Sequence, residues 1–256
     1  MGFGPRPSGS AALQKTRDYI LAELKKAGLA TQLQVFIAKT PLGEVSMANI
    51  IATIPGRRPD RIALASHFDT KLFREIRFVG ASDGASSTAA LLELARALKS
   101  RQSEFTIELI FFDGEEAVVE WGRNNDNTYG SRHYVVTAQR AGSLKGLRAL
   151  VLLDMIGDKD LVIRRDTLST PWLVDTIWNA ASRLGYGNVF SNEMTSVDDD
   201  HVPFITAGVP AVDIIDLDYR AWHTAADTLE NVSPRSLQIV GDVVLAALPD
   251  IEQRLR

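Results

Sequence analysis

The stretch FTIELIFFDGEEAVVEW, residues Phe105–Trp121, decides the fold. Its first eight residues are almost continuously apolar, as expected for a strand that is buried in a parallel sheet. Asp113 and Gly114 end this run, and Glu115 and Glu116 follow on the glycine turn. A buried strand that ends on several charges needs partners for them, because an unpaired buried carboxylate is costly. The stretch therefore predicts a sheet with a polar site at its edge.

Strand-like and helix-like segments alternate along the rest of the chain. The segments with the length and aliphatic content of strands are 31–38, 49–55, 61–66, 105–112, 148–154 and 208–216. The segments with helical periodicity and end signals are 10–28, 88–100, 171–185 and 233–248. The alternation predicts a single α/β domain, 1–256, with a mixed, mostly parallel sheet flanked by helices. The first strands are closely spaced, and we expect them to form an antiparallel edge.

The composition narrows the classes of partner and of site. The 256 residues carry a net charge of −4 and contain no cysteine. The charge argues against a nucleic-acid or membrane partner, and the absence of cysteine leaves His, Asp and Glu as metal ligands. We expect a monomer. The opening MGFGPRPSGS lacks the basic and apolar regions of a signal peptide, so a periplasmic or secreted location would require that one had been removed.

Acidic residues and histidines recur where the predicted strands end. Besides the paired glutamates, they are His67, Asp69, Asp83, Asp154 and His223. Each alone fits a helix cap, a turn or a hydrogen-bonded structural residue. Together they lie at the edge where open α/β sheets bind ligands, and they favour a catalytic metal site. The two glutamates then divide the work, one as a metal ligand and the other as a general acid or base.

Several motifs resemble those of the glutaminyl-peptide cyclotransferases, the zinc-dependent glutaminyl cyclases of animal type. They extend over nearly the whole chain and are PRPSGS, SHFDTK, FVGASDGAS, FFDGEEAVVEW with NTYGSRHY, LLDMIG, DDHVPFITAGVP and WHT. The resemblance implies the α/β sandwich of the zinc aminopeptidases. It also implies substrates that are peptides or proteins with an N-terminal glutamine, which is cyclised to pyroglutamate with loss of ammonia.

The resemblance implies roles for individual residues. One zinc ion per chain would be bound by Asp83, Glu116 and His223, and Glu115 would transfer the proton. The zinc would polarise the γ-amide of the substrate glutamine.

The resemblance extends to residues around this centre. Asp154 and Asp199 would complete a hydrogen-bonded proton network around the catalytic glutamate. Trp121 and Trp222 would line the substrate pocket.

The chain also departs from the animal enzymes. Ser66 and Thr88 occupy the positions of their disulfide, as suits a bacterial or otherwise disulfide-independent relative. The segment 157–171 is shorter, and 190–198 differs in sequence, so the loops at the substrate entrance are expected to differ.

Two other classes fit part of the pattern. In a two-zinc aminopeptidase of the same fold, His67 and Asp154 would help to bind a second metal and Asp83 would bridge the two ions. The insertion that carries Trp121 favours the cyclase, in which His67 has only a supporting role. A non-catalytic module is disfavoured because every ligand position is intact.

The remaining histidines are weaker candidates for function. We expect His133 to be structural and His201 to support Asp199 and Asp200. Asp198 and Asp200 fit a solvated turn equally well.

Overall fold

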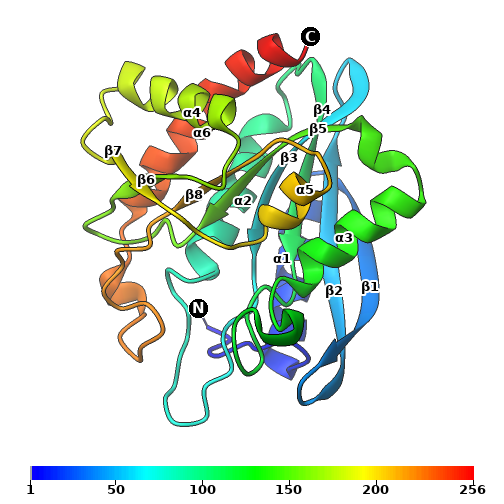
Figure 1. The fold of residues 1–256 in the computed structure, drawn as a ribbon, viewed down its shortest axis with the longest axis vertical. Coiled ribbons are helices and arrows are strands. Elements are labelled where there is room, and N and C mark those ends of the chain that lie inside the picture. Colours follow the sequence, from blue (N-terminus) through cyan, green and yellow to red (C-terminus); the bar gives the residue numbers. More distant parts are fainter. Residues whose placement is uncertain (1) are drawn as a thin grey trace.

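The computed structural model describes residues 2–256, and a six-stranded sheet forms its centre (Figure 1). The order across the sheet is β1-β2-β4-β3-β5-β8. The strands are β1 (Ala30–Thr40), β2 (Gly43–Ile54), β3 (Arg58–His67), β4 (Phe105–Phe112), β5 (Leu147–Asp154) and β8 (Ala211–Ile215). β2 is antiparallel to both β1 and β4, whereas β4, β3, β5 and β8 are mutually parallel. The predicted mixed, mostly parallel sheet is confirmed, and β1 with β2 forms the antiparallel edge.

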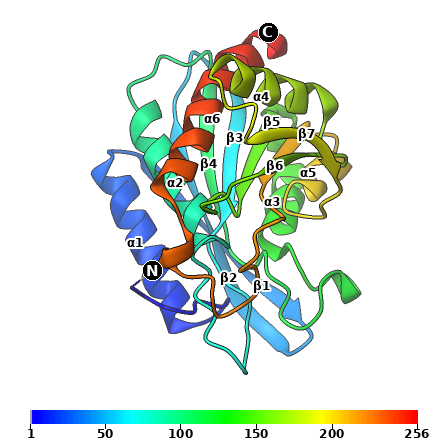
Figure 2. The same cartoon turned by 90° about the vertical axis from the view of Figure 1, so that its left-hand side faces the viewer.

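Helices cover both faces of the sheet (Figure 2). One face carries α1 (Ala11–Lys26), α2 (Ala85–Leu98) and α6 (Pro234–Leu255), with α4 (Pro171–Arg183) packed beside α6, and the other carries α3 (Tyr129–Arg140) and α5 (Val202–Thr206). Alternation along β4 supplies both cores. Ile107, Leu109 and Phe111 contribute to the core beneath α1, α2, α4 and α6. Ile110 and Phe112 contribute to the core beneath α3 and α5.

Some elements differ from the sequence prediction. The last helix continues through Pro249 to Leu255, because Leu248 and Ile251 remain fully buried on either side of the proline. Helix α3 and the small parallel sheet of β6 (Ile163–Asp166) and β7 (Phe190–Thr195) were not predicted. Residues 2–256 also contain three short 3₁₀ turns: η1 (Arg123–Asn125), η2 (Ser143–Gly146) and η3 (Leu229–Asn231).

The topology brings loops that are distant in the sequence to one edge. Strands β3, β4, β5 and β8 are parallel, so their carboxyl ends meet at the same side of the sheet. The loops after these strands and the turn before α2 together form the candidate site. None of the helices within 2–256 has the length and apolar character needed to cross a bilayer.

Candidate active site

The turn after β4 presents the two glutamates. Gly114 has a φ of 75°, and a Cβ there would lie 2.5 Å from the Met47 sulfur, so only glycine fits this close approach. The Asp69 carboxylate accepts hydrogen bonds from the backbone N–H groups of Glu115, at 3.2 Å, and Glu116, at 3.3 Å. Asp69 therefore fixes the backbone of both glutamates while their side chains point into the site.

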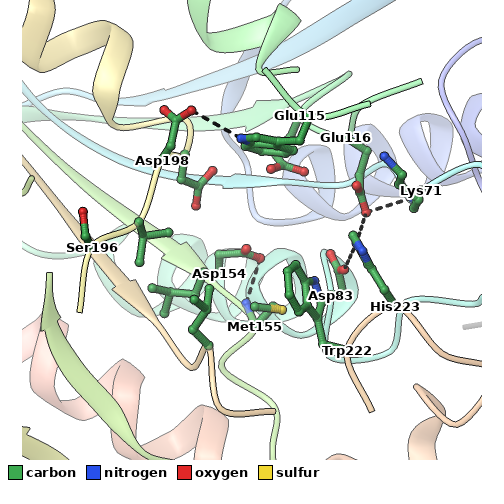
Figure 3. A pocket seen from close by; sticks show the side chains of 15 residues that line it. Lys71, Asp83, Glu115, Glu116, Asp154, Met155, Ser196, Asp198, Trp222 and His223 are labelled. Carbon is green, nitrogen blue, oxygen red and sulfur yellow. Dashed lines mark hydrogen bonds and ion pairs between the residues drawn. The ribbon is translucent and has the colours of Figure 1, made fainter. Parts of the chain in front are cut away.

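Asp83, Glu116 and His223 form a group that could hold a metal ion (Figure 3). One donor atom from each lies within 4.8 Å of the others. His223 Nε2 is 3.4 Å from Asp83 Oδ2 and 3.3 Å from Glu116 Oε1. The backbone N–H of Lys71 donates to the same Glu116 oxygen at 2.9 Å. Two carboxylates and one imidazole, the carboxylates buried, are a donor set that suits zinc.

The electrostatics of this group fit a cation. Burial and the nearby Asp83 raise the pKa of Glu116 to about 7. Burial lowers the pKa of His223, but hydrogen bonds to the two carboxylates outweigh it and raise the value to about 9. A bound cation would stabilise both carboxylates in the ionised form that binds metal.

His67 lies between two pairs of carboxylates. Its Nε2 is 3.0 Å from Asp154 Oδ1 and 3.3 Å from Asp83 Oδ1. Its Nδ1 is 3.5 Å from Asp69 Oδ1 and 3.6 Å from Glu115 Oε2. His67, Asp83 and Asp154 therefore form a second group of buried donors within 4.8 Å of one another. The structure thus brings together the residues of the two-metal alternative as well.

Glu115 lies in a region where protonated carboxyls are favoured. Burial raises its pKa well above the ordinary value; His67 opposes this, whereas Glu116 and Asp199 add to it. Burial and the neighbouring Asp154 likewise raise the pKa of Asp199 to about 7. Burial also raises the pKa of Asp154, against the opposing effect of His67. Carboxyls whose pKa is raised in this way hold a proton more readily than ordinary carboxyls, which suits a group that transfers protons.

A cavity of about 340 Å³ opens onto both groups. Trp121 and Trp222 line it and are 37% and 43% exposed, respectively. The Trp121 indole N–H donates to Asp198 Oδ2 at 3.3 Å, which joins the loop after β4 to the loop before α5. The remaining lining residues are Lys71, Asp83, Glu115, Glu116, Asp154, Met155, Ser196, Val197, Asp199, Ile215, Leu217 and His223. The cavity combines apolar walls with a polar, acidic floor, as small-molecule and side-chain pockets do.

His223 combines a strained backbone conformation with close aromatic neighbours. Its φ of 54° is left-handed, which costs a non-glycine residue about 1–2 kcal/mol. The ring stacks on Trp222, with 4.6 Å between centroids, and meets Phe73 and Phe78 edge-on at 5.5 and 5.6 Å. Strain that persists at such a position points to a functional constraint on the side chain.

The other predicted residues take the following places. His133 lies on α3 and stacks on Phe36 with 4.2 Å between centroids. His201 is buried, with Nε2 3.1 Å from Asp166 and Nδ1 3.9 Å from Asp213, so its nearest carboxylates are not its chain neighbours. Asp198 is exposed at the cavity.

Asp200 does not lie in a solvated turn. It is fully buried and accepts a hydrogen bond from Ser131, because α3 packs against the start of α5.

Some contributors were missed from the sequence. Lys71, in the SHFDTK motif, lines the cavity and donates from Nζ to the Ala117 carbonyl at 2.7 Å. Asp126 accepts hydrogen bonds from the backbone of Val118, Val119 and Glu120 and so shapes the loop that presents the tryptophan. An aspartate inside a polar, irregular stretch gives no sequence signal for this role.

Comparisons with known proteins agree with this geometry. Residues 49–248 match the family model described as Peptidase family M28. The mouse (Mus musculus) glutaminyl-peptide cyclotransferase-like protein is 31% identical over 275 residues, which cover 96% of this chain and 72% of that protein.

Two solved structures are also similar. The Acidobacteriales bacterium glutaminyl cyclase is 41% identical, with a TM-score of 0.94 over 98% of this chain and 90% of that chain. The Porphyromonas gingivalis glutaminyl cyclase is 32% identical, with a TM-score of 0.89 over 97% and 93%.

Proposed function

The chain belongs to peptidase family M28 and is a glutaminyl-peptide cyclotransferase, and from this premise we propose that it converts the N-terminal glutamine of peptides or proteins to pyroglutamate and releases ammonia. The observation that supports the proposal most directly is the position of Glu115. Its buried carboxyl lines one cavity together with two tryptophans and the three residues that could hold a metal ion. A candidate proton carrier, a candidate metal group and apolar walls therefore lie next to one another, which supports the proposal.

We propose that Asp83, Glu116 and His223 bind one zinc ion. The fit rests on two buried carboxylates whose nearest cationic side chains are histidines, and on the short distances between the donors. When bound, zinc would supply Lewis-acid polarisation to the γ-carbonyl oxygen of the substrate. Trp121 and Trp222 would hold the glutamine side chain folded back toward its own amine, which brings the reacting groups together.

Glu115 would move the proton that the reaction has to relocate. The α-amine nitrogen forms a bond to the γ-carbonyl carbon, and the bond from that carbon to the amide nitrogen breaks. Glu115 accepts a proton from the attacking amine and returns it to the departing nitrogen, so that ammonia leaves and no proton is consumed. Asp154 and Asp199, which line the same cavity as Glu115 and whose pKa values are raised, would keep a proton available.

The test is to incubate the protein, loaded with one equivalent of zinc, with a peptide that begins with glutamine. We expect one ammonia per peptide and an intact chain that has lost the mass of ammonia. The matched control is the same peptide with an acetylated amine, which cannot attack its own side chain and should release nothing. Release of free glutamine, without ammonia, would contradict the proposal.

A second function is favoured by one specific observation. His67, Asp83 and Asp154 form a second donor group beside the first, as a two-zinc aminopeptidase would require. Metal analysis separates the two functions. A cyclase should keep full activity with about one zinc per chain, whereas an aminopeptidase should need two and release N-terminal residues of several kinds.

A further inference from the structure

Arg6 is a buried cation beside the candidate metal site. It is 4% exposed, and among residues 2–256 it is the only arginine or lysine that is buried. It precedes α1, in the PRPSGS segment, and lies against the loop after β3 and the turn before α2. It does not line the active-site cavity. A guanidinium is seldom buried without a specific set of partners.

The partners of Arg6 are carbonyl oxygens of two loops. Nε donates to the Phe68 carbonyl at 2.7 Å, and Nη1 donates to the Val79 carbonyl at 2.6 Å. Nη2 donates to the carbonyls of Gly80, at 3.1 Å, and Asp83, at 3.3 Å. The rigid fork of the guanidinium thus joins the chain next to His67 with the turn that ends on the predicted metal ligand.

The backbone of Arg6 strengthens the same connection. Its N–H donates to Thr70 Oγ1 at 3.0 Å, and its carbonyl accepts from the Thr70 N–H at 3.3 Å. Two glycines allow this close packing. A Cβ on Gly84 would lie 3.2 Å from Nη2, tighter than usual, and one on Gly80 would lie 2.5 Å from the Asp83 carbonyl oxygen to which Nη2 donates. Both glycines have positive φ values, 80° and 54°.

The turn before α2 is held from its other side by a carboxylate. Asp227 accepts hydrogen bonds from the N–H groups of Ser82, at 2.7 Å, and Asp83, at 3.1 Å. Arg6 donates to the carbonyl of Asp83 and Asp227 accepts from its N–H, so both polar groups of the Asp83 backbone are held by hydrogen bonds. The charge of Arg6 also acts on the surrounding carboxylates, which are Asp69, Asp83, Glu116 and Asp227.

We propose that Arg6 is a positioning residue for the metal site: it orients the turn that carries Asp83 and supplies buried positive charge to the carboxylates around it. The inference rests on the proposed function only through the metal group, and not through the reaction. Its loss should weaken metal binding and lower kcat, while KM should change little because Arg6 lies outside the cavity. Loss of a partner that orients a metal ligand typically weakens metal affinity by about 10- to 100-fold.

The experiment measures zinc affinity without substrate, by competition with a chelator of known affinity. Arg6→Met keeps an unbranched apolar stem like the aliphatic part of arginine but removes the charge and the donors, and we expect zinc binding about 10- to 100-fold weaker. Arg6→Lys restores the charge without the planar fork, and we expect it to recover part of that loss. At saturating zinc, we expect kcat to fall most in Arg6→Met and less in Arg6→Lys.

The matched control is Arg101→Met, which removes a contact to Glu252 far from the metal group. It should lower thermal stability without changing zinc affinity. If Arg6→Met binds zinc as tightly as the unaltered protein, Arg6 is merely structural and the proposal is overturned.

A third variant covers the case in which Arg6→Met does not fold. Thr70→Val removes one acceptor of the Arg6 backbone and should weaken zinc binding a few-fold; unchanged affinity in both Thr70→Val and Arg6→Lys would again overturn the proposal. Failure of the unaltered protein to cyclise a glutamine peptide would contradict the proposed function and leave this measurement intact.

Discussion

The two ends of the parallel strands treat negative charge in opposite ways. Near the amino ends of β3 and β4, three glutamates each contact an arginine side chain within 3.1 Å, namely Glu104 with Arg58, Glu108 with Arg61 and Glu252 with Arg101. At the carboxyl ends, across the described residues, no arginine or lysine side chain lies within 4.0 Å of the side-chain carboxylates of Asp83, Glu115, Glu116, Asp154 or Asp199.

This difference shows what each end is suited for. Paired charges at the amino end are satisfied within the chain, and their contribution is to stability. At the carboxyl end the cationic side chains point elsewhere, since Arg6 and Lys71 donate to carbonyl oxygens. The buried carboxylates there are left for an added cation and for protons, at a cost in stability that the rest of the core has to offset.

We expect the largest effect on kcat, from a substitution that removes proton transfer at the carboxyl ends of the strands and leaves the amino ends unaltered. Glu115→Gln keeps the shape of the side chain and removes its ability to carry a proton. We expect kcat to fall by roughly 10²- to 10⁴-fold, the usual contribution of a general acid or base, with zinc content unchanged. Glu120→Gln, in the exposed part of the same loop, is the matched control and should leave kcat within about twofold. Full turnover by Glu115→Gln would remove the proposed role.

The pH dependence of stability should also separate the two ends. In protein stripped of metal, Asp199 has a pKa raised by burial to about 7, whereas an unfolded aspartate titrates near pH 4. The folded state therefore binds the proton more tightly, and its stability should fall as the pH rises from about 4 through 7, on the order of 1.4 kcal/mol for each pKa unit.

Urea unfolding at pH 5 and pH 8 measures this effect. Asp199→Asn, which cannot ionise, should show a smaller decrease between the two values. A stability that increases from pH 5 to pH 8 would show that the carboxyl end is not destabilised by its own charge.

The fold was largely predictable because its main signal is local. Strand β4 has the bounds predicted for it, since its apolar run is uninterrupted from Phe105 to Phe112. Parallel strands must also end together, so the meeting of His67, Glu116 and Asp154 could be expected from the topology. Strand β7 was not predicted because most of its side chains are exposed or half-buried, which leaves no core-facing pattern.

Residue type and topology predicted which side chains gather at the site, but neither the role of each glutamate nor the residues that support them. Which glutamate binds metal was assigned by resemblance, because adjacent residues have the same local signal. The supports of the site were missed because their contacts join distant parts of the chain. Arg6 reaches the Val79 carbonyl across 73 positions, and Asp227 reaches Ser82 across 145. Such hydrogen bonds depend on the finished fold, which no local pattern encodes.

Removing one charge at each end should change stability in opposite directions. Asp199→Asn in metal-free protein at pH 8 relieves a buried carboxylate that has no arginine or lysine partner, and we expect the free energy of unfolding to rise by at least about 1 kcal/mol. Glu252→Gln keeps an acceptor for the Glu104 N–H but loses the ion pair with Arg101, and we expect a decrease of about 1 kcal/mol. Chemical denaturation of both variants measures the two changes. A loss of stability in both variants would mean that other groups of the folded protein already compensate the charge of Asp199.

We expect the smallest effects from the substitution of two tryptophans, each of which donates one hydrogen bond. Trp121 donates to Asp198 at the cavity, whereas Trp178 is buried and donates to the Ser191 carbonyl at 2.7 Å. Trp121→Phe keeps an aromatic wall but frees the Asp198 loop, so KM for a glutamine peptide should rise about threefold at nearly constant stability, a loss of less than 1 kcal/mol in binding. Trp178→Phe should instead lower stability by about 1 kcal/mol and leave KM unchanged, since its partner is a backbone carbonyl of β7 outside the cavity. Steady-state kinetics and thermal unfolding of both variants decide the matter. If Trp121→Phe acts on stability rather than on KM, the exposed aromatics belong to the scaffold, and the carboxyl end is less specialised for substrate than its charges suggest.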